Sequence, residues 1–153
     1  MKKKIKILII IAFCAYSLFF LIGSILAPIM AHFKQYDISG VLTTTYMFSC
    51  HQRPERSFWI FGYPIALCCR CLGFYLGVIL SSLTVIIKKW NIPFKLFCIL
   101  SVFVLIDILS NYMFKISTHN IIRFIIGIIM GFLFINLICY GFEYAKGEKD
   151  RVR

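Results

Sequence analysis

The sequence of 153 residues has little charge, and especially little negative charge. Only 15% of its residues are charged and only 6 are Asp or Glu, whereas about a quarter of an ordinary soluble domain is charged. A soluble fold of this size leaves much of its surface in water, and a chain that is 61% hydrophobic lacks the polar residues to cover that surface. The composition excludes an ordinary soluble domain and predicts a chain whose main solvent is lipid.

The chain also lacks the short motifs of many well-known catalysts. It contains no glycine-rich nucleotide loop, no H-E-x-x-H and no G-x-S-x-G, which excludes the simpler motif-bearing hydrolases and ATPases. This absence leaves open whether the chain is an enzyme. Internal repeats and low-complexity linkers are absent too, so we predict a single membrane domain over residues 1–153.

Four long apolar runs are present, over residues 7–30, 66–87, 94–114 and 121–144. Roughly 20 apolar residues cross the hydrocarbon core of a bilayer as a helix, so each run predicts a transmembrane helix. The first run follows a basic leader that resembles a secretory signal, but it exceeds the roughly 7–15 residues of a signal core. We therefore expect a retained helix and an all-α integral membrane protein with four spans.

The net charge is +11, and most Lys and Arg residues stand at the ends of these apolar runs. This placement predicts that the basic residues contact anionic lipid headgroups and not nucleic acid. If the N-terminus is cytoplasmic, the cytoplasmic side holds Lys2, Lys3, Lys4, Lys6, Lys88, Lys89, Lys95, Lys146, Lys149, Arg151 and Arg153. The other side holds Lys34, Arg53, Arg56, Arg70, Lys115 and Arg123. Because the basic excess marks the cytoplasmic side, we predict a multi-pass cell-membrane protein with both termini cytoplasmic and a structured outer loop between the first two spans.

Two glycine pairs indicate how the helices pack. Gly73 and Gly77 are four residues apart in the second span, as are Gly127 and Gly131 in the fourth. Small residues at this spacing let helix backbones approach closely in lipid. The pairs predict a contact between the second and fourth spans.

Cysteines gather around the outer loop and predict a metal site. Cys68 and Cys71 form a C-x-x-C, and Cys50 with His51 precedes them in the loop. Three thiolates and one imidazole suit tetrahedral zinc. Adjacent residues of an extended chain point in opposite directions, so Cys50 and His51 can share one ion only if the backbone turns there.

Two other interpretations of the same cysteines stay open. A C-x-x-C beside Arg70 at a helix N-terminus favours a reactive thiolate, which suits a thiol–disulfide oxidoreductase coupled to quinone. A structural disulfide from Cys50 to Cys68 or Cys71 is the simpler alternative on the extracytoplasmic side. The three cysteines inside spans, Cys14, Cys98 and Cys139, are expected to be packing residues.

Charged residues inside the membrane form the second candidate site. Asp107 lies near the middle of the third span, where an unpaired carboxylate is costly, so it should face a partner such as Arg70 or Arg123. These three residues are the catalytic candidates. A wider polar set is expected to converge under the outer loop and to bind an anionic lipid or isoprenoid phosphate through guanidinium groups; it comprises Gln52, Arg53, Arg56, Arg70, Asn120 and Arg123.

Three blocks of sequence resemble a known family. They are CHQRPERSF from Cys50, CxRCxGxYxG from Cys68 to Gly77, and N-x-x-R-x-x-x-G-x-x-x-G from Asn120 to Gly131. Together with Asp107 they resemble domain of unknown function 2085, a set of small prokaryotic multi-span membrane proteins. The resemblance implies that Cys50, Cys68 and Cys71 are the outer cysteines of the pattern. Cys69 stands where the family usually has a small residue, and Ile108 stands where a glycine usually follows the aspartate.

Three functions from different classes follow from this sequence. The first is a membrane protein with a zinc-like Cys/His site and an Arg/Asp pocket that binds or handles an anionic lipid-linked group. The second is the quinone-coupled oxidoreductase. The third is a non-catalytic accessory or transporter subunit, in which the motifs only secure the fold.

Overall fold

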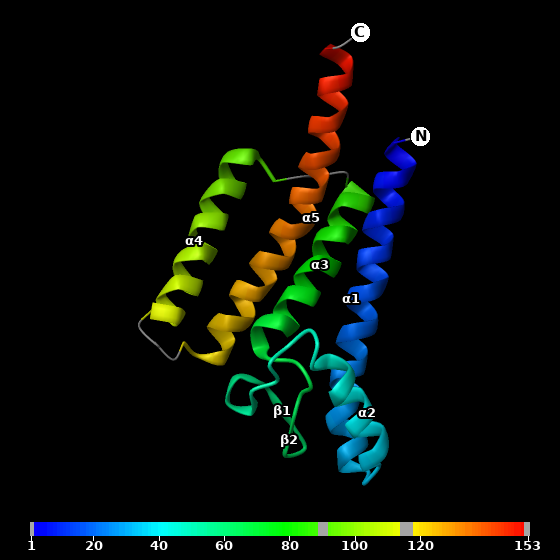
Figure 1. Cartoon of the computed structure of the whole chain (residues 1–153), viewed down its shortest axis with the longest axis vertical. Coiled ribbons are helices and arrows are strands. Elements are labelled where there is room, and N and C mark those ends of the chain that lie inside the picture. The colour runs from blue at the N-terminus through cyan, green and yellow to red at the C-terminus, as the bar shows by residue number, and fades with distance from the viewer. Residues whose placement is uncertain (1, 89–91, 114–117, 152–153) are drawn as a thin grey trace.

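The computed structural model describes residues 2–88, 92–113 and 118–151 and is almost wholly helical (Figure 1). Its helices are α1 (Lys2–His32), α2 (Tyr36–Tyr46), α3 (Cys69–Lys88), α4 (Phe94–Met113) and α5 (Asn120–Arg151), with a short 3-10 helix at Pro54–Arg56. The strands β1 (Trp59–Ile60) and β2 (Tyr63–Pro64) form one small hairpin. The predicted all-α membrane architecture is confirmed at this level.

Three of these helices are long and apolar enough to cross a membrane: Lys4–His32, Cys69–Ile87 and Asn120–Tyr144. They match the first, second and fourth predicted spans. The fourth candidate, α4, is a 20-residue helix that coincides with the predicted span at 94–114 but is not among those three. The predicted connectors at 88–93 and 115–120 lie partly outside the described residues. Four residues that enter the sequence predictions lie wholly outside them: Phe114, Lys89, Lys115 and Arg153.

The closest helix contact joins α3 and α5, and glycines make it possible. A Cβ on Gly73 would meet the backbone carbonyl of Phe124, and a Cβ on Gly131 would meet the carbonyl of Phe74. The two backbones therefore touch where both helices lack a side chain. This confirms the predicted contact between the second and fourth spans, and it fixes the N-terminus of α3 beside that of α5 (Figure 1).

The loop between α1 and α3 begins with a helix that folds back along α1. Lys34 adopts a positive φ of 60°, which reverses the chain after α1, and α2 then runs beside the C-terminal part of α1 (Figure 1). Tyr46, at the end of α2, is 1% exposed, and its hydroxyl lies against Gly23 of α1. From the level of His32 back to that of Gly23 the chain thus returns nine residues along α1, or about 14 Å at 1.5 Å per residue, before it reaches Cys50.

A tight hairpin closes the loop. Ile60 pairs with Tyr63, and the two residues between them, Phe61 and Gly62, both have positive φ (52° and 80°), as a type I′ turn requires. The ring of Phe61 stacks on His32 at the end of α1, with centroids 4.5 Å apart. The amide of Ala66 donates to the carbonyl of Ser24 at 3.3 Å. These contacts hold the loop to α1 just before α3 begins.

A buried polar network lies towards the opposite end of the bundle. Asn136 of α5 is 1% exposed and donates to the hydroxyl of Ser81 in α3 at 3.2 Å. Its carbonyl oxygen accepts the amide of Ile92 at 3.0 Å, and the Tyr140 hydroxyl donates to the Ile92 carbonyl. The segment that leads into α4 is therefore tied to α3 and α5 at the end away from the cysteine loop.

Candidate metal centre and arginine-lined cavity

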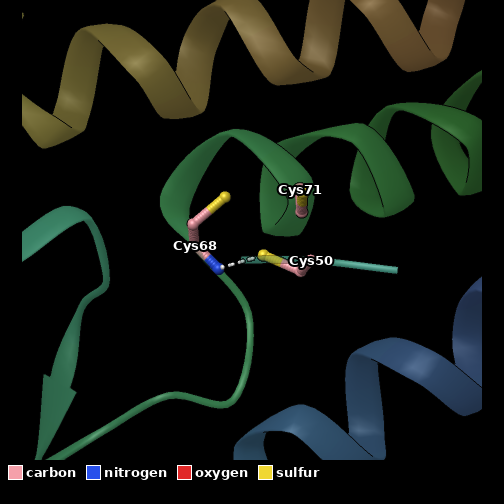
Figure 2. A group of neighbouring side chains, drawn as sticks. All are labelled: Cys50, Cys68 and Cys71. Carbon is pink, nitrogen blue, oxygen red and sulfur yellow. Dashed lines mark hydrogen bonds between the residues drawn. The ribbon is translucent and has the colours of Figure 1, made fainter. Parts of the chain in front are cut away.

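Three cysteines from separate parts of the chain meet in one group. Cys50 follows α2, Cys68 directly precedes α3, and Cys71 lies in the first turn of that helix. Their Sγ atoms all lie within 4.8 Å of one another, and Figure 2 shows the three side chains around a common centre. We call Cys50, Cys68 and Cys71 the thiol group.

The backbone around Cys50 turns sharply and wraps its sulfur. The Cys50 amide donates to the carbonyl of Tyr46 at 3.0 Å, which places it against α2. Gln52 then adopts a positive φ of 47°, and its amide points back to Cys50 Sγ at 3.5 Å. The Gln52 side chain donates to the Thr43 carbonyl at 2.6 Å, which fixes this uncommon conformation. The backbone does turn here, but the turn does not bring His51 into the thiol group.

The surroundings of Cys50 favour its thiolate form. The thiols of Cys68 and Cys71 donate hydrogen bonds to Cys50 and hold its pKa well below the ordinary value, against the opposing effect of burial. The backbone amide of Cys68 also donates to Cys50 Sγ at 3.2 Å (Figure 2). Because the thiolate is the form that binds metals and attacks disulfides, the Cys50 sulfur is suited to either chemistry.

The fourth predicted ligand, His51, lies outside the thiol group. His51 is exposed and lines the same cavity, but its ring is not among the grouped ligand atoms. Cys69 is fully buried one residue away from Cys68, also outside the group. All seven cysteines are free thiols in this structure. The structure therefore brings together three of the four predicted ligands.

The thiol group opens into a cavity of about 540 Å³ on which four arginines converge. The lining arginines are Arg53, Arg56, Arg70 and Arg123, accompanied by Ser49 and His51. Arg53 and Arg56 come from the loop and are exposed, while Arg70 comes from α3 and Arg123 from α5. Loop and helices thus contribute positive charge to the same concave surface as the sulfurs. We call this the arginine-lined cavity.

Two of these arginines, Arg70 and Arg123, have polar side-chain partners. Arg70 Nη2 donates to Asp107 Oδ2 of α4 at 2.5 Å, with side chains 27% and 10% exposed. Arg70 Nε is buried without a hydrogen-bond partner among the described residues. Arg123 is 6% exposed, and its Nε donates to the Thr118 hydroxyl at 3.0 Å. The structure thus gives Asp107 one of the two partners expected from the sequence.

Gln52 and Asn120 lie beside the cavity and support its walls. The Gln52 side chain is bonded to the backbone of α2, as described above. Asn120 Nδ2 points to the carbonyls of Ser57 (3.5 Å) and Glu55 (3.4 Å), which fastens the start of α5 to the 3-10 helix. Both side chains position the loop that carries Arg53 and Arg56.

Sequence reasoning missed several polar residues. Ser49 lines the cavity, Thr118 holds Arg123, and Asn136 organises the network at the other end. Asn136 had a readable signal, because an amide inside an apolar span must find a partner. Ser49 and Thr118 had none, since loop hydroxyls occur throughout membrane proteins.

Comparison with known proteins places the chain in a family. The family described as "Predicted membrane protein (DUF2085)" matches residues 50–137. An uncharacterized protein of Methanocaldococcus jannaschii is 34% identical over 140 residues, which is 85% of this chain and 87% of the relative. An uncharacterized protein of Methanothermobacter thermautotrophicus is 30% identical over 93 residues, 56% of this chain and 80% of the relative. No solved structure matches. The chain belongs to the DUF2085 family.

Proposed function

We propose that this DUF2085 member is a four-span cell-membrane protein, with both termini cytoplasmic, that holds a zinc ion in the thiol group and binds an anionic lipid-linked group in the arginine-lined cavity. The observation that carries the proposal is the sharing of one cavity by three sulfurs and four guanidinium groups. Neither feature alone would suggest both ligands.

The topology is supported by helix length and by charge placement. The 20 residues of α4 extend about 30 Å, which is the thickness of the hydrocarbon core. Its one acidic residue, Asp107, is paired with Arg70, which lowers the cost of placing it in lipid. With four spans and the basic excess inside, the thiol group lies on the extracytoplasmic side.

Zinc is supported by the chemistry and the spacing of the donors. Tetrahedral zinc with Zn–S bonds of about 2.3 Å holds its sulfurs about 3.8 Å apart. The Sγ atoms lie within 4.8 Å of one another, so small rotamer adjustments bring them onto one ion. Thiolates select zinc over the hard ions magnesium and calcium.

An anionic ligand is supported by the arginines and by their depth. Guanidinium groups bind phosphate oxygens in pairs, and four of them line a cavity of about 540 Å³, within the usual size of ligand pockets. The cavity lies at the N-terminal ends of α3 and α5, where lipid headgroups meet the helices. An isoprenoid phosphate or another anionic lipid fits this position.

Metal analysis of detergent-purified, reduced protein tests the zinc site. We expect about one zinc ion per chain, held by the three thiolates, and loss of most of it in Cys71→Ser. Cys69→Ser is the matched control, because Cys69 neighbours the group without belonging to it, and it should keep its zinc. Wild-type protein without metal above background would disprove the zinc site, as would equal metal content in Cys71→Ser.

Thermal stabilisation by lipid tests the anion site. An isoprenoid phosphate should raise the unfolding temperature of the purified protein, whereas the uncharged isoprenol should not, since only the former engages the guanidinium groups. Arg56→Gln should weaken the response, and Lys34→Gln, an exposed charge outside the cavity, should leave it unchanged. Equal stabilisation by both lipids would remove the anion site from the proposal.

Thiol–disulfide chemistry is the second candidate, favoured by the stabilised thiolate of Cys50 next to two further thiols. Oxidation of Cys68 and Cys71 to a disulfide would release two electrons and two protons, which convert a quinone to a quinol. Thiol trapping in cells before and after quinone depletion separates the candidates: a change of state supports redox coupling, and constant thiols exclude it.

If Arg123→Ala and Cys71→Ser merely lower protein abundance to the same extent, the accessory-subunit interpretation replaces both.

A further inference from the structure

The thiol group supplies three ligands to an ion that prefers four. Within the described residues, the grouped ligand atoms are the sulfurs of Cys50, Cys68 and Cys71. His51 is exposed at the cavity wall and is not part of the group. Zinc sites with three protein ligands keep the fourth position for water or for a bound molecule, whereas structural sites are closed by four protein ligands.

The open side of the thiol group faces the arginines. All three cysteines line the same cavity as Arg53, Arg56, Arg70 and Arg123. A molecule that enters the cavity therefore meets the metal position and the guanidinium groups together. The loop segment that follows Cys50 carries Arg53 and Arg56, and the α3 turn that carries Cys71 also carries Arg70, so three of the four arginines stand within six residues of a member of the thiol group.

The balance of charge selects a doubly negative group. A zinc ion with three thiolates carries one negative charge, and Asp107 carries another next to Arg70. These two charges offset two of the four arginines, so two positive charges are left for the ligand. A phosphate monoester or the end of a diphosphate carries about two negative charges at neutral pH.

An unsatisfied donor points to an oxygen-rich ligand. Arg70 Nε is buried and has no hydrogen-bond partner among the described residues, while the Nη2 of the same side chain is bonded to Asp107. A buried donor without a partner is rare, and each one calls for an explanation such as a bound ion. Nε is shielded from solvent here, so a phosphoryl oxygen in the cavity accepts this hydrogen bond after the Arg70 side chain rotates towards it.

We infer that the metal and the arginines form one site, in which a phosphoryl oxygen of the ligand occupies the fourth coordination position of the ion held by Cys50, Cys68 and Cys71. The arginines then hold the remaining oxygens. The inference rests on the proposed function and deepens it: the ligand is a terminal phosphate group, and the metal is part of its binding site and not a separate structural clamp.

Cobalt(II) substitution tests this coordination directly. Cobalt takes the place of zinc in tetrahedral thiolate sites, and its visible absorption reports a change of ligand. We expect inorganic phosphate to alter the spectrum of the cobalt-loaded, full-length protein in a saturable manner. Arg56→Gln should weaken the apparent affinity about tenfold, the loss expected for one charge-assisted hydrogen bond, with unchanged cobalt content. Lys34→Gln is the matched control and should behave as wild type.

His51→Ala distinguishes the inference from a closed structural site. If phosphate supplies the fourth ligand, this variant keeps its cobalt and its response to phosphate. A changed resting spectrum together with loss of metal in His51→Ala would show that the imidazole closes the site, and the inference would be wrong. Phosphate that binds by calorimetry without any change in the cobalt spectrum would also overturn it, while the proposed zinc and anion sites would both survive.

Vesicles identify the source of the phosphate. Cobalt-loaded protein reconstituted in phosphatidylcholine should change its spectrum when phosphatidic acid is included, if the ligand is a lipid headgroup. A response to free phosphate with none to phosphatidic acid assigns the site to a soluble phosphate. Absence of any response to either would refute the shared site.

Discussion

At the residue scale, the ion pair of Arg70 with Asp107 lowers the free-energy cost of burying these two charges between the helices. The two side chains join α3 to α4 at 2.5 Å. Removal of one partner of a buried ion pair leaves an uncompensated charge, which costs far more than replacing both with apolar side chains. The pair is therefore a structural link between α3 and α4, and its Arg70 also lines the arginine-lined cavity.

Asp107→Ala should destabilise the protein by about 3 kcal/mol, because it leaves the Arg70 guanidinium without its carboxylate. The double variant Arg70→Met/Asp107→Leu should be more stable than Asp107→Ala. Unfolding of the purified variants in detergent gives both values. A double variant that is less stable than the single one would show that the pair contributes net stability and would contradict this account.

Asn136 is a second polar residue that hydrogen bonds hold inside the bundle. Asn136→Leu breaks its hydrogen bonds to Ser81 and to the amide of Ile92 and should cost about 1–2 kcal/mol, the usual range for polar contacts between membrane helices. The measurement is again unfolding in detergent. The adjacent Leu137 is 56% exposed, so Leu137→Ala should have a smaller effect, and equal losses would argue against the network.

At the element scale, α3 and α5 make the most extensive helix contact among the described residues, because glycine lets their backbones touch. Close backbone approach also aligns the N-termini of the two helices, which carry Arg70 and Arg123. The cavity wall between them thus depends on residues that have no side chain at all.

Gly131→Ala should separate α3 from α5, since its Cβ would meet the backbone carbonyl of Phe74. Overpacking of this kind costs about 1–3 kcal/mol. Gly141→Ala is the control in the same helix, where nothing lies within 4 Å of the added Cβ, and it should be neutral or stabilising by up to about 1 kcal/mol through helix propensity. Unfolding midpoints in detergent compare the two, and a destabilised Gly141→Ala with an unaffected Gly131→Ala would disprove the argument.

At the scale of the whole molecule, the proposal requires the thiol group and the termini to lie on opposite sides of the membrane. Phe48→Cys, at a position 96% exposed close to Cys50, should react with an impermeant maleimide in intact cells, above the background of the native thiols. Lys4→Cys should react only after the membrane is opened, because the positive-inside rule places that lysine in the cytoplasm. Reaction of both variants from the same side would contradict the topology.

The outer loop shows where prediction from sequence ends. The sequence indicated a structured loop and named its cysteines, yet gave no sign that residues 36–46 fold into a helix lying along α1. The length of the apolar runs is a local property, so three of the predicted spans recur as long apolar helices. The return of the loop depends on one left-handed residue, Lys34, and on the packing of Tyr46 against Gly23, and no periodicity encodes such contacts.

The amino-acid sequence by itself determined that this protein is helical and belongs in a membrane, which helices carry glycine pairs, and which residues hold sulfur and positive charge. These are properties of composition and spacing, and hydrophobic burial acts on them locally. Only the tertiary structure decided that Cys50 joins Cys68 and Cys71 while His51 stays at the cavity wall. The physical reason is that convergence of side chains from separate segments is set by the backbone path between them, through the turn at Gln52 and the tight contact of α3 with α5.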